Sequence, residues 1–223
     1  MARALLFDVF GTVLDPSGLV KPLAAITRDP EAIASEWRGT QLQYTFQLAA
    51  MGRHLPFAEV TRRALQALAA RRGMNIPETT AAALIDAWTH LPVFPDVVPA
   101  LDRLRSRARL AVVSNGDPDQ IEAALSHAGL RSYFDPVVSA AEARSFKPAR
   151  AVYLRAVERL GVRPADVALV SAHSFDVTGG KEAGLRAIWV NRFGAALDDL
   201  GMGPDLEVAT LRDVTAADID SLT

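Results

Sequence analysis

Short apolar segments alternate with helical segments between residues 97 and 190, and this alternation constrains the fold more than any other feature of the chain. Strands that alternate with helices form a parallel sheet that helices cover on both faces. The expected strands, including an apolar run near the N-terminus, span residues 4–7, 110–113, 136–139, 167–170 and 187–190. The expected helices between them span residues 97–106, 118–128, 149–160 and 179–183. We therefore predict an α/β fold with a doubly wound parallel sheet.

Residues 19–91 differ from the rest because they fit helices almost throughout, with prolines as the interruptions. Three helices are expected over residues 31–51, 57–72 and 78–88. The first has two stripes of larger side chains, Trp37, Gln41, Tyr44 and Leu48 on one and Arg38 and Leu42 on the other. We interpret this block as an inserted helical cap. The predicted boundaries are 16–95 for the cap, and 1–15 with 96–223 for a Rossmann-like core.

The composition fits a cytoplasmic enzyme and excludes several other classes. The 223 residues suffice for one sizeable core, or for a core with a modest insertion. The net charge of −2 shows no basic excess that would bind nucleic acid. No apolar stretch approaches the ~20 residues that span a bilayer, and the first one is too short for a signal peptide. Because Cys is absent, disulfides, thiolate metal sites and a Cys nucleophile are excluded.

Polar residues stand at the carboxyl ends of the expected strands or in the loops that follow them. They are Asp8, Ser114 with Asn115, Lys147, and Ser171 with Asp176. Because the strand ends of a doubly wound sheet converge on one crevice, these residues are expected to share a site. Each has an ordinary interpretation by itself. An Asp at a strand end often caps a helix, Lys147 fits a solvated loop, and Arg38 on a helix fits a surface charge.

The order of these motifs carries a family resemblance. The segment Phe7-Asp8-Val9-Phe10-Gly11-Thr12, followed by the three later motifs, resembles the haloacid dehalogenase superfamily across nearly the whole chain. Most members of that superfamily are phosphatases with a second Asp where this chain has Phe10. Further motifs resemble the type II L-2-haloacid dehalogenases specifically. They are Trp37-Arg38-x-x-Gln41-Leu42-x-Tyr44, Met51-Gly52-Arg53, Val113-Ser114-Asn115-Gly116 and Trp189-Val190-Asn191-Arg192.

The resemblance implies that Asp8 is a nucleophile that attacks C2 of a 2-haloalkanoate, expelling halide and forming an aspartyl ester. Water would then hydrolyse the ester and release the 2-hydroxy acid with C2 inverted. Lys147 would hold Asp8 ionised. Thr12 and Ser171 would supply hydrogen bonds that position the carboxylate or its ester.

The resemblance also implies residues around the nucleophile. Asp176 would orient Lys147 and help to activate the water, and Tyr153 would support this network. The implied binding residues are Val9, Phe10 and Ser114 for the substrate carboxylate, Arg38, Asn115 and Phe175 for the halide, and Leu42, Phe57 and His173 for the pocket. Backbone N–H groups at a strand-to-helix turn suit an anion, and a cation beside a ring edge suits a halide. The family implies no metal or other cofactor, a small-molecule substrate and a homodimer.

Three positions depart from the best-known branch of the type II group. His173 stands where that branch has Asn, although His occurs there elsewhere in the group. Phe10 replaces a Tyr, and Gly39 replaces a polar residue. The nucleophile and its partners are unchanged, so these departures bear on pocket size, halide preference and rate.

Other functions are weighed against the leading one. A defluorinating enzyme for fluoroacetate-like acids would use the same residues with a tighter halide pocket. A phosphatase would need Mg²⁺, an acid at the position of Phe10 and a further acidic ligand near Asp176. A non-catalytic relative would be expected to have lost Asp8, Lys147 or Asp176, and all three are present.

The remaining polar residues do not form another recognisable site. Ser171, His173 and Asp176 lie too close together in sequence for a Ser-His-Asp triad, and no Gly-x-Ser-x-Gly elbow accompanies them. The other histidines, His54, His90 and His127, lack the spacing of metal ligands, so no metal site is predicted.

Overall fold

A single parallel sheet forms the centre of the molecule. The computed structural model describes residues 4–198 and 200–222, and within them six strands pair in the order β3-β2-β1-β4-β5-β6. Every neighbouring pair is parallel. The strands are β1 (Ala4–Phe7), β2 (Arg109–Ser114), β3 (Val137–Ser139), β4 (Val167–Ser171), β5 (Arg186–Val190) and β6 (Leu206–Val208). The predicted doubly wound α/β class is confirmed.

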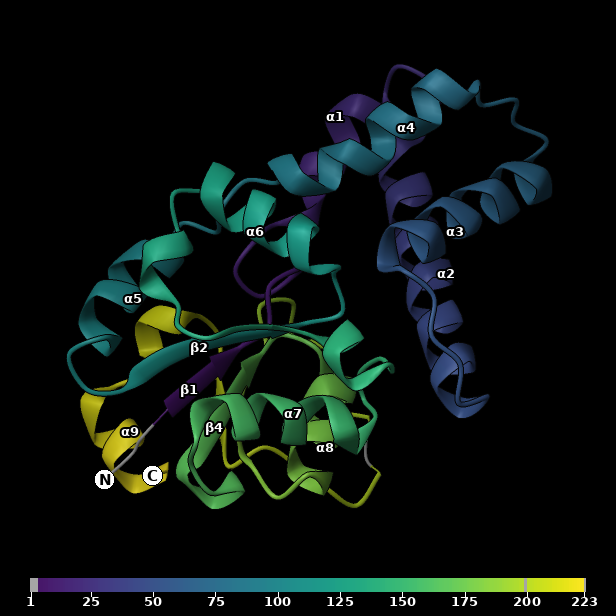
Figure 1. Cartoon of the computed structure of the whole chain (residues 1–223). Helices are drawn as coiled ribbons and strands as arrows, with labels where there is room; N and C mark the ends of the chain where they lie inside the picture. The colour runs from purple at the N-terminus through teal and green to yellow at the C-terminus, as the bar shows by residue number, and fades with distance from the viewer. Residues whose placement is uncertain (1–3, 199, 223) are drawn as a thin grey trace.

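Helices cover both faces of this sheet (Figure 1). Alternation along β1 explains how, since Leu5 and Phe7 join one apolar cluster while Ala4 and Leu6 join the other. The first cluster includes side chains of α5 (Val97–Leu104), α6 (Pro118–His127) and α9 (Ala216–Leu222). The second face is covered by α7 (Arg150–Leu160) and α8 (Ser174–Glu182). Short 3₁₀ helices complete the connections, η3 (Arg131–Tyr133), η4 (Ala140–Ala143), η5 (Pro164–Asp166) and η6 (Leu211–Asp213).

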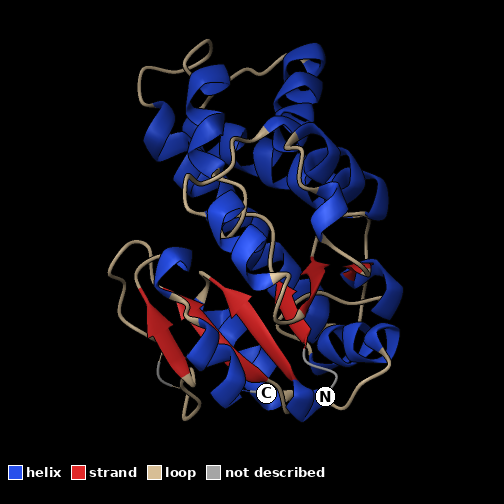
Figure 2. Ribbon diagram, turned by 90° about the vertical axis from the view of Figure 1, so that its left-hand side faces the viewer, coloured by secondary structure: helices blue, strands red, loops and turns tan. Residues whose placement is uncertain are grey.

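All elements between β1 and β2 other than α5 form a helical layer beyond the sheet, which we call the cap. They are η1 (Pro16–Leu19), α1 (Val20–Leu23), α2 (Pro30–Ala50), α3 (Phe57–Arg72), α4 (Glu78–Asp86) and η2 (Ala87–His90). Figures 1 and 2 show these helices gathered at one end of the molecule and the strands at the other. The two connecting segments bind each other, because Asp15 N donates to Pro92 O (2.7 Å) and Phe94 N to Val13 O (3.2 Å). The division at 15/16 and 95/96 stays a prediction.

The helix predicted over residues 179–183 was placed too late. It begins at Ser174, so that Asp176 lies in its first turn. Glycine disfavours a helix interior, but here Gly179 and Gly180 are buried where a Cβ would meet Tyr153 Oη at 2.6 Å and Leu169 Cδ2 at 2.7 Å. Close packing of the helix on its neighbours requires both glycines. The prediction also missed β6 and α9, which are short.

The α2 helix carries the face of the cap that contributes to the candidate site. Asp29 caps it by accepting the N–H of Ala32 (3.3 Å). Of the predicted stripe, Trp37, Gln41 and Leu48 are buried and Tyr44 is half-buried. Among the described residues, no helix is both long and apolar enough to cross a membrane.

Candidate active site

Asp8 follows β1 at the point where the order of the sheet reverses, because β1 lies between β2 and β4. Its backbone N–H donates to Val170 O of β4 (3.0 Å), which extends the pairing by one residue. The chain then turns sharply through Gly11, whose φ is +100°. Ligand sites in open α/β sheets lie at such reversal points, outside the carboxyl ends of the strands.

Lys147 joins the two buried carboxylates of the site. Its Nζ lies 3.0 Å from Asp8 Oδ1 and 2.8 Å from Asp176 Oδ2. Tyr153 Oη donates to the other oxygen of Asp176 at 2.6 Å. All four side chains are almost wholly shielded from solvent, with Asp8 the most accessible at 6% exposed. The structure therefore brings together residues that lie far apart in the sequence, between positions 8 and 176, as the convergence of strand ends predicts.

The charge of this cluster keeps Asp8 an anion. Burial by itself would raise the pKa of the Asp8 carboxyl, but the nearby charge of Lys147 and the hydrogen bond from Thr12 outweigh it and lower that pKa below its ordinary value. Burial would likewise lower the pKa of the Lys147 ammonium, yet Asp176 and Asp8 raise it. The pKa of Tyr153 is raised well above its ordinary value, chiefly by burial, so its phenol remains a donor. Asp8 is thus an ionised carboxylate at neutral pH.

Thr12 and Ser171 differ in their relation to Asp8. Thr12 Oγ1 donates to Asp8 Oδ2 (2.8 Å) and accepts the N–H of Ala172 (2.9 Å), which joins the β1 loop to the β4 loop. Ser171 Oγ accepts the N–H of His173 (3.2 Å) instead. Within residues 4–198 and 200–222 no hydrogen bond joins Ser171 to the Asp8 carboxylate, and a role of Ser171 toward the ester stays a prediction.

The residues predicted to bind the substrate carboxylate lie at the ends of β1 and β2, and Asn115, predicted to bind the halide, directly follows Ser114. Ser114 Oγ accepts the N–H of Gly116 (3.3 Å), and Asn115 Oδ1 accepts the N–H of Lys147 (2.9 Å). The backbone N–H groups of Val9 and Phe10 have no acceptor among the described residues. Two unpaired donors beside Asp8 form an arrangement that can bind an anion.

Arg38 extends from α2 of the cap to the loop that carries Asp8. Its Nη2 donates to Phe10 O (3.3 Å), its Nη1 donates to Gln41 Oε1 (2.6 Å), and its Cζ lies 5.4 Å from the ring centre of Trp88. Burial lowers the pKa of the Arg38 guanidinium to about 10 against the attraction of Asp8, so Arg38 stays charged at neutral pH. The predictions assigned no role to Gln41 or Trp88. The Arg38–Gln41 spacing of three residues was the signal available for Gln41.

His173 contacts the same loop from the core, and Phe175 packs on the ring of His173. His173 Nε2 lies 2.9 Å from Phe10 O and 3.8 Å from Asp8 Oδ2. Because a carbonyl oxygen only accepts, the proton of the neutral ring must be on Nε2. The His173 ring stacks on Phe175 (5.3 Å between centres), which contacts Phe46 of the cap edge-on (5.0 Å). Phe10 O therefore accepts from Arg38 of the cap and from His173 of the core.

The two remaining predicted pocket residues lie in the cap. Phe57 is buried and packs on Phe146, next to Lys147, with 6.3 Å between ring centres. Leu42 is half-buried on α2.

Comparison with known proteins identifies the family. A family model described as haloacid dehalogenase-like hydrolase matches residues 2–184. The chain belongs to the haloacid dehalogenase-like hydrolases. It is similar to the (S)-2-haloacid dehalogenase of Pseudomonas sp. strain YL, with 34% identity over 95% of this chain and 92% of that protein. Haloacetate dehalogenase H-2 of Moraxella sp. strain B is 32% identical over 94% of each.

A solved structure of the same family agrees closely in fold. The L-2-haloacid dehalogenase from Xanthobacter autotrophicus, with chloropropionic acid covalently bound, superposes with a TM-score of 0.87. It is 30% identical in sequence, and the match covers 96% of each chain. The resemblance to this group of haloacid dehalogenase-like hydrolases is confirmed.

The structure also shows how the residues considered for a Ser-His-Asp triad and for a metal site are arranged in this hydrolase. Asp176 is held by Lys147 and Tyr153, while His173 Nε2 is bound to Phe10 O, so the three residues do not form a Ser-His-Asp triad with Ser171. Among the described residues, no group of three or more His, Asp or Glu side chains is arranged to hold a metal ion.

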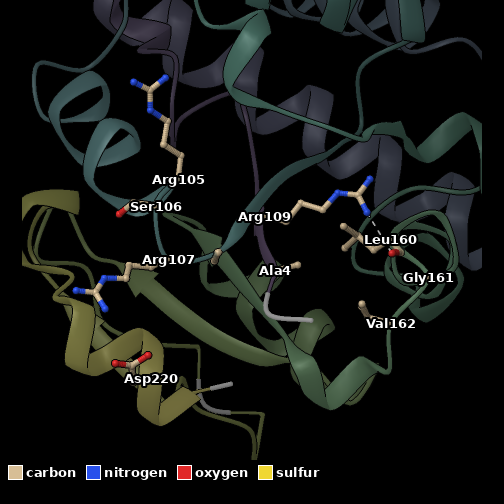
Figure 3. Close-up of a pocket in the computed structure, with 10 residues that line it drawn as sticks. Ala4, Arg105, Ser106, Arg107, Arg109, Leu160, Gly161, Val162 and Asp220 are labelled. Carbon is tan, nitrogen blue, oxygen red and sulfur yellow. Dashed lines mark hydrogen bonds between the residues drawn. The ribbon is translucent and has the colours of Figure 1, made fainter. Parts of the chain in front are cut away.

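A large hollow of about 700 Å³ lies at the amino ends of the strands, beside Ala4 at the start of β1 (Figure 3). Three arginines line it, but their side chains point in different directions. Arg105 pairs with Asp102 (3.0 Å), and Arg109 donates to Asp135 O (2.8 Å) and Leu160 O (3.3 Å). This hollow is at the opposite end of β1 from Asp8, and its charges do not converge as those around Asp8 do.

Proposed function

We propose that this hydrolase converts short L-2-haloalkanoic acids to 2-hydroxy acids, with Asp8 as the nucleophile. One observation supports the proposal most strongly. Asp8 is buried yet ionised, held by Lys147 and Thr12, and the cation of Arg38 donates to the carbonyl of Phe10, two residues after Asp8. A shielded carboxylate with an adjacent cation suits attack on carbon with release of an anion.

In the proposed first step, one oxygen of Asp8 attacks C2 from the side opposite the halogen. The carbon–halogen bond breaks, the halide leaves with the bonding electrons, and an aspartyl ester forms. The N–H groups of Val9 and Phe10, with Ser114, hold the substrate carboxylate. Arg38, Asn115 and Phe175 surround the departing halide. Displacement from the opposite side inverts C2.

In the proposed second step, water adds to the carboxyl carbon of Asp8. The bond from this carbon to the ester oxygen breaks, one proton ends on the product hydroxyl, and the other is released. Asp176, oriented by Tyr153, holds Lys147 and helps to activate the water. Ser171 acts indirectly, since it positions His173 through the backbone. Because C2 takes no part in this step, its inversion is kept.

Haloacetates are included in the proposed substrate class, and with them fluoroacetate. The relative named haloacetate dehalogenase H-2 supports this extension. Leu42, Phe57 and His173 are proposed to line the side of the pocket that receives the alkyl group. We also propose, from the family resemblance, that the protein is a cytoplasmic homodimer.

The proposal is tested by incubating the purified protein and its Asp8→Asn variant with L- and D-2-chloropropionate, chloroacetate, fluoroacetate and p-nitrophenyl phosphate, with and without EDTA. Halide release from the L-acid that persists in EDTA and disappears in the variant is expected, with D-lactate as the product. Phosphate release that depends on Mg²⁺, without halide release, would overturn the proposal.

The aspartyl ester is tested separately. In a single turnover in ¹⁸O-labelled water, the label is expected in Asp8 and not in the product. Label in the product hydroxyl would show that water attacks C2 directly, and the nucleophilic role of Asp8 would be wrong.

A further inference from the structure

Asp117 occupies the N-cap position of α6 but does not cap that helix. Asp is among the residues that best cap their own helix, yet no hydrogen bond joins the Asp117 side chain to α6. Its two carboxylate oxygens accept the N–H groups of Phe57 and Ala58 instead, both at 2.8 Å. These are the first two residues of α3, in the cap. A core carboxylate thus caps a helix of the cap.

The N-terminus of α3 has no other side-chain cap. Pro56 stands at the N-cap position and makes no capping hydrogen bond. Glu59, the acidic residue of the first turn, is paired with Arg62 and Arg63. The helix leaves N–H groups and partial positive charge at this end, and both favour an anion there. Asp117 supplies that anion across the contact between cap and core.

The contact between Asp117 and the start of α3 is next to the candidate site in both the core and the cap. On the core side, Asp117 directly follows Ser114–Gly116, where Asn115 accepts the N–H of Lys147. On the cap side, Phe57 packs on Phe146, the neighbour of Lys147. A shift of α3 would therefore break the Asp117 bonds and move Phe57 relative to Lys147.

We propose that Asp117 is a positioning residue that latches the cap onto the core and holds Phe57 against Phe146, beside Lys147. Asp8 and Lys147 are shielded from solvent, and the proposed latch assigns access for the substrate to a movement of the cap. The latch would favour the closed arrangement in which Phe57 and the Ser114–Gly116 segment face each other. The proposal rests on the proposed function, because it assigns Phe57 to the substrate pocket.

The latch is tested with Asp117→Ala, with Asp117→Asn, which keeps one acceptor oxygen, and with Asp119→Ala, which removes an exposed acid of α6 nearby. Asp117→Ala is expected to raise KM for 2-chloropropionate about 2- to 30-fold, the effect of losing a helix cap, with a smaller change in kcat. NMR is expected to show faster amide exchange at Phe57 and Ala58. Asp117→Asn should lie in between, and Asp119→Ala should match the wild type.

Two results would overturn the latch. One is faster exchange at Phe57 and Ala58 in Asp117→Ala with KM unchanged, which would make Asp117 a local helix cap only. The other comes from the Asp8→Asn protein, where added L-2-chloropropionate should slow exchange at these amides, and no slowing would contradict the proposal. The second measurement holds even if Asp117→Ala does not fold. If the wild type releases no halide, the proposed function fails instead.

Discussion

A Cβ atom on Gly11 would lie 2.7 Å from Nε2 of His173, closer than side-chain atoms approach each other. The imidazole therefore occupies space that only glycine leaves open. The backbone of Gly11 also has φ of +100°, a region that residues with a side chain rarely adopt. The loop that carries Asp8 and the ring of His173 consequently depend on each other.

Gly11→Ala is expected to lower the free energy of unfolding by about 1–3 kcal/mol, from backbone strain at this φ. It should also displace His173 from Phe10 O and reduce kcat/KM for the haloacid. Urea unfolding and steady-state kinetics check the two effects. Unchanged stability and activity would mean that the loop adapts to a side chain.

Gly39→Ala is the matched control, and the expected change in its free energy of unfolding has the opposite sign. Gly39 lies inside α2, and a Cβ there would have nothing within 4 Å. Because glycine destabilises a helix interior, Ala is expected to raise the free energy of unfolding by about 0.5–1 kcal/mol. Because Gly39 is exposed on α2, activity should be unchanged, and a changed KM or halide preference would instead show that this position affects the pocket.

Lys147→Gln removes the cation that joins two buried carboxylates. Loss of one partner from a buried ion pair typically destabilises a protein by about 3–5 kcal/mol.

The pH dependence of this loss follows from Asp8. In the wild type the pKa of Asp8 is lowered, so its contribution to stability is present above pH 3.8 and is lost as pH falls through the lower folded value. In the variant, burial is unopposed by Lys147 and the pKa of Asp8 should rise, so stability should fall as pH increases through it.

Urea unfolding at pH 5 and pH 8 measures the loss of stability in Lys147→Gln relative to the wild type. This loss should be larger at pH 8. Lys181→Gln provides the control, because Lys181 makes a 2.7 Å pair with Asp205 that is partly exposed. Such a pair typically contributes about 0–1 kcal/mol. An equal effect of Lys147→Gln at both pH values would contradict the electrostatic account of Asp8.

Tyr153→Phe removes a buried hydroxyl that donates to Asp176 Oδ1 at 2.6 Å. A hydrogen bond to a charged group contributes about 1.5–3 kcal/mol, so the variant should unfold more easily by that amount. The freed carboxylate should hold Lys147 less well, and kcat should fall. Tyr133→Phe is the comparison, since its hydroxyl bonds Asp102 at an exposed position (3.0 Å). Equal losses in the two variants would argue against a special role for Tyr153.

The part of the site that depends on the sheet could be predicted from the sequence. Apolar runs that end in polar residues give both the strand and the edge at which Asp8 and Asn115 lie, because parallel strands share a direction. Lys147 joins them there as expected. The α3 helix was predicted with its observed bounds, since prolines and a C-terminal glycine mark its ends.

The contacts between cap and core could not be predicted in this way. Asp117 has the sequence of a local helix cap, and only the orientation of α3 makes it a partner of Phe57. Ser171 was predicted to position the Asp8 carboxylate or its ester, and the sequence did not indicate that its oxygen accepts the N–H of His173 in the local turn. The early start of α8 was missed because the two glycines were interpreted as the start of the helix, whereas their close packing on Tyr153 and Leu169 places them inside a helix that begins at Ser174. Pairings of this kind depend on tertiary packing, which no local pattern contains.

His173 makes a testable difference to the pH dependence of the enzyme. Burial chiefly, together with Arg38, lowers the pKa of His173 against the opposing effects of Asp8 and the Phe10 carbonyl, so the ring is neutral at pH 7. Because the folded pKa is below the unfolded one, the stability that the neutral ring contributes is present above pH 6.5 and is lost as pH falls through the folded value. An imidazolium 3.8 Å from Asp8 Oδ2 would also weaken Asp8 in its proposed role as nucleophile.

His173→Asn keeps an N–H donor for Phe10 O but cannot titrate. The wild-type profile of kcat/KM for 2-chloropropionate is expected to fall on the acid side below pH 6.5, and the variant should hold its own plateau to lower pH. Its urea-unfolding stability should likewise change less between pH 7 and pH 5. His173→Phe, which fills similar space without the donor, should lose activity at every pH, which separates the hydrogen bond from the charge. An acid limb that is the same in the wild type and in His173→Asn would assign the titration to another group and remove His173 from this role.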